Sequence, residues 1–234
     1  MAYNDAMKII AIETSTEACS AALLVDTEVS ESYRVAPREH TELILPMIDS
    51  LLAEAGLERT QLDAVAFGRG PGAFTGVRIA AGVAQGIAFA LDVPVTPVST
   101  LAALAHRVWR ETGHTHVMSA IDARMGEVYW GSYIIETLGK AVLLGKETVC
   151  SPDTVPIPEG ERWFGAGTGW ETYANALSAR CTKALCGVDG QRFPHAHDVA
   201  RLGATMLSSG QAVAAELALP IYLRDQVVQK KEAK

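Results

Sequence analysis

The sequence predicts an α/β protein of two lobes, each built on a mixed sheet with helices on its faces. A meander of β-rich runs opens the chain, and helical and strand patterns alternate after it up to residue 100. A second set of strand and helix patterns follows, without a low-complexity linker between the two sets. We therefore expect a first lobe at residues 1–100 and a second, smaller lobe at residues 101–234.

The elements of the first lobe follow from local patterns. Two β-rich runs surround the polar turn Thr14-Ser15-Thr16-Glu17, and a third run comes directly after Asp26-Thr27, which together predict a meander. A helix is expected at 41–56, where Gly56 is typical of a C-terminal stop and Pro46 lies near the first turn. The expected strands are 8–14, 18–25, 28–35, 62–68 and 93–98, and a second helix covers 74–91.

The second lobe shows the same kinds of pattern. A helix at 99–112 opens it, and a strand pair is expected around Arg124-Met125-Gly126. The Pro-rich segment 151–160 is typical of a loop. The strands expected here are 117–123, 127–136 and 162–165, and the helices are 170–179 and 197–209. The sequence leaves open whether this last helix packs back on the first lobe.

Composition excludes several classes of protein. The chain of 234 residues is 49% hydrophobic and 20% charged, with a net charge of −7, so it lacks the basic surface that binds nucleic acid by neutralising phosphates. Any contact with RNA would need a partner's basic surface. The four cysteines form no C-x-x-C pair, which indicates packed thiols in a reducing compartment such as the cytoplasm.

Two features bear on targeting. The leader MAYNDAM has neither a basic nor an apolar region, so we expect no signal peptide, and a natural start at Met7 fits the pattern equally well. Whether residues 1–6 are native is left open. The most apolar run is interrupted by Arg78 and Gln85, and we therefore expect no membrane span.

The glycine-rich stretch GRGPGAFTGVRIAAGVAQGIAFAL at 68–91 resembles a nucleotide-binding loop but lacks its chemistry. A P-loop ends in Gly-Lys-Ser/Thr, whereas this loop continues Phe74-Thr75-Gly76-Val77 without a lysine. The dinucleotide fingerprint also fails, because Thr75 stands where its last glycine belongs. The alternatives are an anion site at the helix N-terminus and a tight strand-to-helix turn.

Both helices of the first lobe are apolar over more of their circumference than one core contact requires. On the second helix Arg78 and Gln85 share one narrow side, and Gly82 and Gly86 recur at a spacing that lets another backbone approach closely. On the first helix the apolar residues, which include Leu43, Met47 and Leu51, cover about half the circumference. Composition alone does not decide whether the chain's own second lobe or a partner covers these helices.

Several motifs together resemble the bacterial TsaB family, also called YeaZ, over essentially the full length. They are IAIETST at 10–16 with CSAAL at 19–23, REHTE at 38–42 with LP at 45–46, GPGAFTGVR at 70–78, PVSTL at 97–101, IDARMGEVY at 121–129 and PIYLR at 220–224. The resemblance implies an actin-like ATPase (ASKHA) fold of two related lobes. It also implies a role in making N6-threonylcarbamoyladenosine beside the anticodon of tRNAs that read codons starting with A.

The resemblance further implies partners and a surface. Proteins like TsaB act with a paralogue, TsaD, and with the ATPase TsaE, they pair with themselves when alone, and they meet tRNA only through the complex. In that family the first-lobe helices form the interface, here 41–56 and 74–91. The interface residues expected on these helices are Leu43, Met47, Leu51, Phe74, Arg78, Gly82 and Gly86.

The sequence argues against chemistry by the chain itself. The catalytic paralogue has a metal-binding histidine pair where this chain reads Ser99-Thr-Leu-Ala-Ala103, so neither histidine is present. His40 stands alone, and the pairs at 114/116 and 195/197 lack acids or thiols at ligand spacing, so we expect no metal. A peptidase is not expected either, because H-E-x-x-H and G-x-S-x-G are both missing.

The competing hypothesis is a stand-alone nucleotide hydrolase or kinase. It would use the turn Glu13, Thr14, Ser15 and Thr16 as a phosphate-binding hairpin, with the backbone of Gly165 and Gly167 approaching the nucleotide. Tight turns explain the same residues structurally. We expect a non-catalytic scaffold without an intrinsic cofactor, and leave open whether ATP or ADP binds at the interface with the partner.

Overall fold

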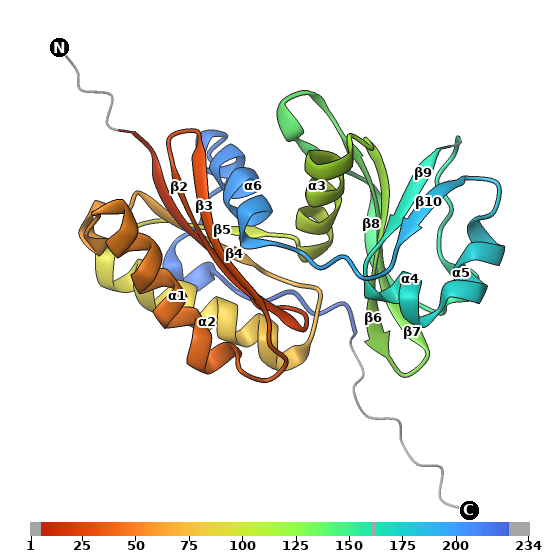
Figure 1. The fold of residues 1–234 in the computed structure, drawn as a ribbon, viewed down its shortest axis with the longest axis horizontal. Coiled ribbons are helices and arrows are strands. Elements are labelled where there is room, and N and C mark those ends of the chain that lie inside the picture. Colours follow the sequence, from red (N-terminus) through yellow and green to blue (C-terminus); the bar gives the residue numbers. More distant parts are fainter. Residues whose placement is uncertain (1–5, 161, 225–234) are drawn as a thin grey trace, which may run out of the picture.

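The computed structural model describes residues 6–160 and 162–224, which form two sheets lying side by side (Figure 1). The first sheet has the strand order β3-β2-β1-β4-β5. Strand β1 pairs antiparallel with β2 and parallel with β4, so the sheet is mixed. Its strands are β1 (Lys8–Glu13), β2 (Ala18–Val25), β3 (Glu28–Val35), β4 (Ala64–Gly68) and β5 (Val95–Val98).

Helices cover both faces of this sheet, so β1 is buried on both. Ile10 and Ile12 point to the side of α1 (His40–Ala55) and α2 (Phe74–Leu91), whereas Ile9 and Ala11 point to the opposite side. That opposite side is covered by α6 (Ala196–Ser208), which packs on β1, β2 and β4. Figure 1 shows α1 and α2 on one side of the sheet and α6 on the other.

The second sheet has the order β10-β9-β6-β7-β8. Helix α3 (Thr100–Thr112) packs on one face through Leu101 and Val108, and a tryptophan-rich cluster around Trp130 and Trp170 fills the other. Two short helices lie on that second face, α4 (Thr168–Thr172) and α5 (Ala174–Cys181). The strands are β6 (His116–Arg124), β7 (Glu127–Ile135), β8 (Ala141–Cys150), β9 (Trp163–Ala166) and β10 (Leu185–Asp189).

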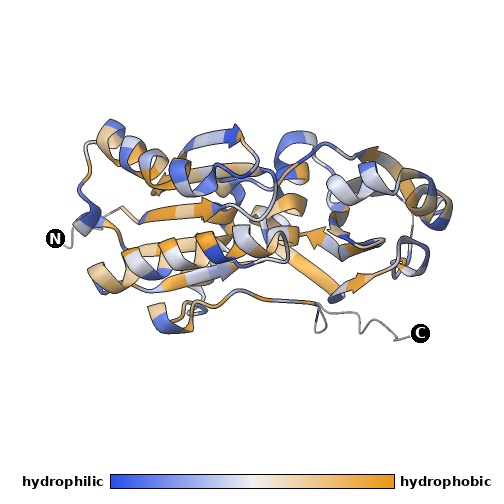
Figure 2. Ribbon diagram, turned by 90° about the horizontal axis from the view of Figure 1, so that it is seen from below, coloured by the Kyte–Doolittle hydropathy of each residue, from blue (hydrophilic) through white to orange (hydrophobic). Residues whose placement is uncertain are grey.

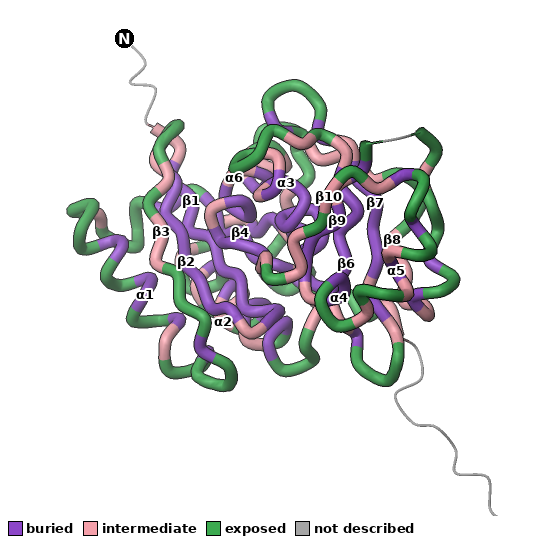
Figure 3. Tube along the Cα trace, turned by 45° about the vertical axis from the view of Figure 1, so that its right-hand side comes forward, coloured by how far each residue is buried: buried purple, intermediate pink, exposed green. Residues whose placement is uncertain are grey.

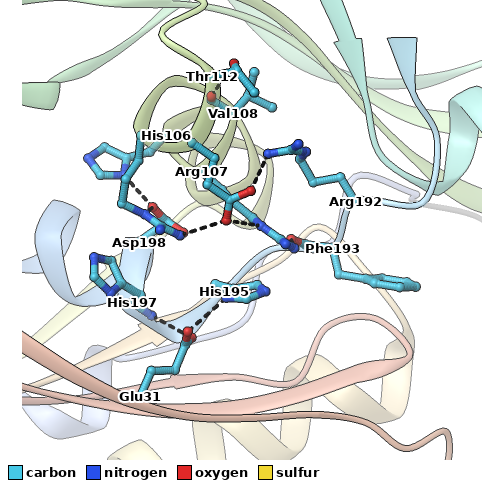
Figure 4. A network of polar contacts seen from close by, with 12 residues as sticks. Glu31, His106, Arg107, Val108, Thr112, Arg192, Phe193, His195, His197 and Asp198 are labelled. Carbon is cyan, nitrogen blue, oxygen red and sulfur yellow. Dashed lines mark hydrogen bonds and ion pairs between the residues drawn. The ribbon is translucent and has the colours of Figure 1, made fainter.

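The lobes meet where α3 packs against α6, around one buried carboxylate. Asp198 of α6 accepts a hydrogen bond from His106 Nδ1 at 2.6 Å (Figure 4). It accepts another from Arg110 Nε at 2.9 Å, and both donors belong to α3. Burial raises the pKa of Asp198, but the hydrogen bonds from His106 and Arg110 outweigh it and hold this pKa below its usual value. The network therefore ties the lobes together through an ionised carboxylate.

Most of the expected elements are present. Gly56 ends α1 in the left-handed conformation, as a C-terminal stop does. Strands β8 and β10 were not predicted, and the single helix expected at 170–179 is two short helices separated at Tyr173. Short 3-10 turns complete the chain: η1 (Arg59–Gln61), η2 (Thr137–Gly139), η3 (Pro152–Thr154) and η4 (Ala215–Leu217).

The chain returns to the first lobe after residue 195. Helix α6 covers the first sheet, η4 packs on α2, and Val213 bridges to Val95 at the edge of β5. Residues 196–221 therefore lie on the first lobe, so the last helix does pack back, as the sequence left open, and the second lobe ends before it. Residues 1–5, which carry most of the leader, lie outside the described part of the chain.

Helix α2 corrects the expectation that no run is long and apolar enough to span a membrane. By length and composition alone, Phe74–Leu91 passes that test despite Arg78 and Gln85. Its inner face packs on β4 and contributes Val77, Ala80 and Ala84 to the core of the first lobe. The helix is thus a sheet-covering helix with an additional apolar face.

Candidate functional site

The outer face of α2 is apolar, and no other part of residues 6–160 and 162–224 covers it. The small residues of its inner face, such as Ala80 and Ala84, allow α2 to lie close to the sheet. On the opposite side Phe74 is 54% exposed and Phe89 is 80% exposed. Gly82 and Gly86 lie exposed between them, and a Cβ atom at either position would meet no other heavy atom within 4 Å. Figure 3 shows α2 beside the first sheet, with buried and more exposed residues along the same helix.

Helix α1 contributes less to this surface than expected. Met47 and Leu51 are buried against the first sheet, together with Ile44 and Ile48, so their side chains belong to the protein's own core. This corrects their assignment to a partner interface. Leu43 is partly buried, and Leu45, which was not among the expected interface residues, is exposed.

Arg78 is held in place by two aromatic rings. Its guanidinium carbon lies 3.6 Å from the centroid of the Phe74 ring, and its Nε donates a hydrogen bond to the Tyr222 hydroxyl at 2.8 Å. The Phe74 and Tyr222 rings are 5.8 Å apart. Such contacts restrict a long, flexible side chain. Tyr222 was missed by sequence reasoning, although it lies in the PIYLR motif.

The turn Glu13–Thr16 is not open to a phosphate, because the glycine-rich loop lies on it. Ala73 N donates a hydrogen bond to the Ser15 carbonyl at 2.7 Å, and the Thr14 hydroxyl donates to the Gly76 carbonyl at 2.7 Å. Gly76 must be glycine, because a Cβ atom there would overlap the Thr14 carbonyl oxygen. All four turn residues are buried. The glycines thus let α2 start directly against the turn and cradle no anion.

The buried carboxyl group of Glu13 connects three parts of the protein. Its carboxylate is fully buried and accepts hydrogen bonds from Ser15 N at 2.6 Å and from the Thr100 hydroxyl at 3.3 Å. Burial raises its pKa, partly offset by the hydrogen bonds from Ser15 and Thr100. Gly68 leaves the space that this carboxyl group fills. Glu13 therefore joins the first turn, the end of β4 and the start of α3.

Gly165 and Gly167 serve packing inside the second lobe. A Cβ atom on Gly165 would overlap the indole of Trp170, whose Nε1 donates to the Met118 carbonyl at 2.9 Å. Gly167 has a φ of +104°, and a Cβ atom there would overlap the Ala120 carbonyl oxygen. With the turn at 13–16 also buried, the residues expected to bind nucleotide form no open site in this chain.

Asp122, Arg124 and Glu127, around the turn between β6 and β7, lie near the first lobe. Arg124 bonds Asp122 Oδ2 at 2.7 Å and reaches across to Glu17 of the first lobe at 3.1 Å. Asp122 also accepts a hydrogen bond from the Tyr173 hydroxyl at 3.1 Å. These groups satisfy one another and link the two lobes.

The histidines have local partners. His40 is buried with its Nε2 2.9 Å from the Thr16 carbonyl oxygen, and His195 Nδ1 lies 2.9 Å from Glu31 Oε2 (Figure 4). His114 stacks on Phe164, and His116 contacts the edge of Trp163. Within residues 6–160 and 162–224, no three His, Cys, Asp or Glu side chains are grouped to hold a metal ion.

Cys19, Cys181 and Ser99 lack the activating partners of a nucleophile. Burial raises the pKa of the Cys19 and Cys181 thiols to about 11, so both are protonated at neutral pH. Ser99 caps α3 by accepting from Ala102 N at 3.2 Å, and its hydroxyl donates to Glu147. Two open grooves of about 430 and 390 Å³ lie on the second lobe beside Ile157 and Pro158, away from every expected site residue.

Two curated relatives match almost the entire chain. The tRNA threonylcarbamoyladenosine biosynthesis protein TsaB of Escherichia coli (strain K12) is 43% identical over 232 residues, which cover 96% of this chain and 98% of the relative. The protein of the same name from Haemophilus influenzae is 40% identical over 233 residues, covering 96% and 97%. The chain belongs to the TsaB family.

The structural comparison agrees with this family. YeaZ from Pseudomonas aeruginosa superposes with a TM-score of 0.87 and 49% identity, covering 93% of this chain and 100% of that one. A second P. aeruginosa structure, described as having similarity to peptidase YeaZ, gives the same TM-score at 48% identity, with the same coverage of both chains. The family model of TsaD, tRNA N6-adenosine threonylcarbamoyltransferase, matches residues 28–231. The two mixed sheets of this TsaB-family chain thus form an actin-like ATPase fold, and its family serves threonylcarbamoyladenosine synthesis.

Proposed function

We propose that this chain is a non-catalytic scaffold subunit that binds a TsaD-like transferase through the outer face of α2 and the exposed part of α1. The complex, which includes a TsaE-like ATPase, would transfer the threonylcarbamoyl group to N6 of the adenosine beside the anticodon. The observation that carries this proposal is the apolar, glycine-bearing face of α2, which the described part of the chain leaves uncovered.

The absence of a catalytic role is supported by the local environments. The turn at 13–16 is filled by the loop before α2, and Ser99 is committed to Glu147 and the cap of α3. A stand-alone nucleotide hydrolase or kinase would need that turn open. A nucleotide bound by the complex would instead lie at the interface with the partner. A homodimer would use the same face of α2 when the transferase is absent.

The net charge of −7 supports indirect contact with tRNA, through the basic surface of a partner. A tRNA-modifying complex of this kind would work in the cytoplasm. The functional site in this proposal is therefore the outer face of α2, which faces the partner, and not a pocket.

Size-exclusion chromatography with light scattering tests the proposal directly. The chain is measured alone and mixed with the TsaD-like protein of the same organism, as wild type and as Gly82→Leu. Leucine at this exposed helix position leaves the monomer folded, because leucine favours helix more than glycine does. We expect a heterodimer for the wild type and its loss for Gly82→Leu.

Asn175→Leu, an exposed position on α5 of the second lobe, is the matched control and should bind like the wild type. A heterodimer that forms equally well with Gly82→Leu would exclude the face of α2. If the wild type forms no heterodimer, the scaffold proposal fails and the nucleotide hydrolase or kinase becomes the hypothesis to test.

A further inference from the structure

The exposed apolar surface continues beyond α2 onto the end of the described chain. We name residues 213–224 the C-terminal strap. The strap starts at the bridge between Val95 and Val213, and its 3-10 turn η4 packs on α2. It then passes the loop after β4, where Ile221 N donates a hydrogen bond to the Arg69 carbonyl oxygen at 2.8 Å. Figure 2 shows this segment running along the lower edge of the first lobe beside α2.

Both ends of the strap are fixed. Val213 and Val95 exchange two backbone hydrogen bonds of 2.8 Å, which hold the first end to the edge of the first sheet. At the other end Arg224 donates to the Ala123 carbonyl at 3.1 Å and pairs with Glu127 in the turn between β6 and β7. The strap therefore spans both lobes and presents its outer side in a defined position.

That outer side is apolar. Leu217 is 62% exposed and Leu219 is 58% exposed, and Ile221 and Tyr222 are exposed as well. Tyr222 joins this row to α2, because it contacts both Arg78 and Phe74. A contiguous apolar surface of this kind on a folded chain marks an interaction site.

We propose that the C-terminal strap is the second half of the docking surface, and that one subunit covers it together with α2. This inference rests on the proposed function and names the transferase subunit as the occupant. The strap and the outer face of α2 form one continuous surface, because they share the contact between Phe74, Arg78 and Tyr222.

The chemistry of the occupant follows from the charges. Arg78 is the single charged residue of α2, and between Val213 and Leu223 the strap adds only Glu216. The partner therefore presents an apolar face with a carboxylate opposite Arg78. A second copy offers one such carboxylate on these two elements, Glu216, so the self-dimer is the alternative that the experiment must separate.

Leu219→Asp tests the inference. A carboxylate at this exposed position leaves the fold intact but would be buried, unpaired, under the partner. Calorimetric titration with the TsaD-like protein should show affinity reduced by at least about tenfold. Leu138→Asp is the matched control: Leu138 is 96% exposed in the loop after β7, and its variant should bind within about twofold of the wild type.

The outcomes separate the inference from the function on which it rests. If Leu219→Asp binds like the wild type while Gly82→Leu does not bind, α2 is the docking surface and the strap is not part of it. If Gly82→Leu also binds normally, the proposed function itself fails. If Leu219→Asp weakens only the self-dimer, measured by light scattering, the occupant is a second copy and the transferase assignment is wrong.

Discussion

The backbone amide of Ala73 donates a hydrogen bond to the carbonyl oxygen of Ser15, at 2.7 Å. This contact places the loop before α2 on the turn where actin-like proteins would hold a phosphate. Gly72 in this loop and Gly76 in the first turn of α2 lack side chains, which makes the approach possible. A sequence feature that resembles a nucleotide-binding loop therefore fixes the start of α2 to the first turn.

Two glycines of α2 should respond in opposite directions to the same substitution. Gly76→Ala places a methyl group against the Thr14 carbonyl, and we expect it to lower the free energy of unfolding by about 2 kcal/mol or more. Gly82→Ala meets no neighbour within 4 Å and should raise it by up to about 1 kcal/mol through helix propensity. Urea unfolding of the two variants beside the wild type measures both. Equal effects would contradict the packing described for the turn.

Removal of the Asp198 carboxylate should destabilise the folded protein strongly, because it leaves Arg110 and His106 without their shared partner. We expect Asp198→Ala to lower the free energy of unfolding by about 3 kcal/mol or more. Asp49→Ala, which breaks an exposed pair with Arg59, should change it by less than about 1 kcal/mol. Denaturant titration at neutral pH compares them.

The same carboxylate makes the stability of the fold depend on pH in the acid range. The pKa of Asp198 is below its usual 3.8 in the folded protein, so its ionised form stabilises the fold above that pH, and this contribution is lost as pH falls toward the folded pKa. The stability difference between wild type and Asp198→Ala should therefore shrink below about pH 4. A difference that grows with acid would contradict the network.

Glu13 should show the opposite dependence. Its folded pKa is raised above 4.5, so the folded state binds a proton more tightly than the unfolded chain does, and stability falls as pH rises between the two pKa values. Glu13→Gln removes this titration while keeping an acceptor for Ser15 N. We expect the stability of the variant relative to wild type to increase with pH above about 4.5, by up to about 1.4 kcal/mol per pH unit within that window. Thermal unfolding from pH 4 to 8 tests this, and a constant difference would show that Glu13 stays ionised.

The first lobe could be predicted from the sequence because its signals are local. Gly56 ends α1, and the meander β1 to β3 follows from β-rich runs separated by polar turns. Strand β10 was missed because it is short and its pairing with β9 shifts register between Leu185 and Gly187. Strand β8 was missed because Gly145 and a register shift break its alternation. Both lie at sheet edges, where half-exposed residues weaken the hydrophobic pattern.

The site could be predicted only in part. Helical periodicity identified α2 as too apolar for one contact, but it could not separate the sheet-facing Met47 and Leu51 from the exposed Leu45, since a wide apolar arc contains both sides. Tyr222 lies 144 positions from Arg78, so their contact depends on tertiary structure. The close approach of Gly76 to Thr14 likewise exists only after the loop and the turn are brought together.

The return of α6 to the first sheet has a consequence for how the chain is made. Ile9 and Ala11, near the start, are covered by a helix that begins at Ala196. During synthesis the first sheet therefore emerges with one apolar face bare, and it stays bare until nearly the whole chain has left the ribosome. A ribosome stalled after the second lobe would carry a nascent chain that recruits chaperones and is cut readily by protease, whereas release of the last residues would bury that face in one step.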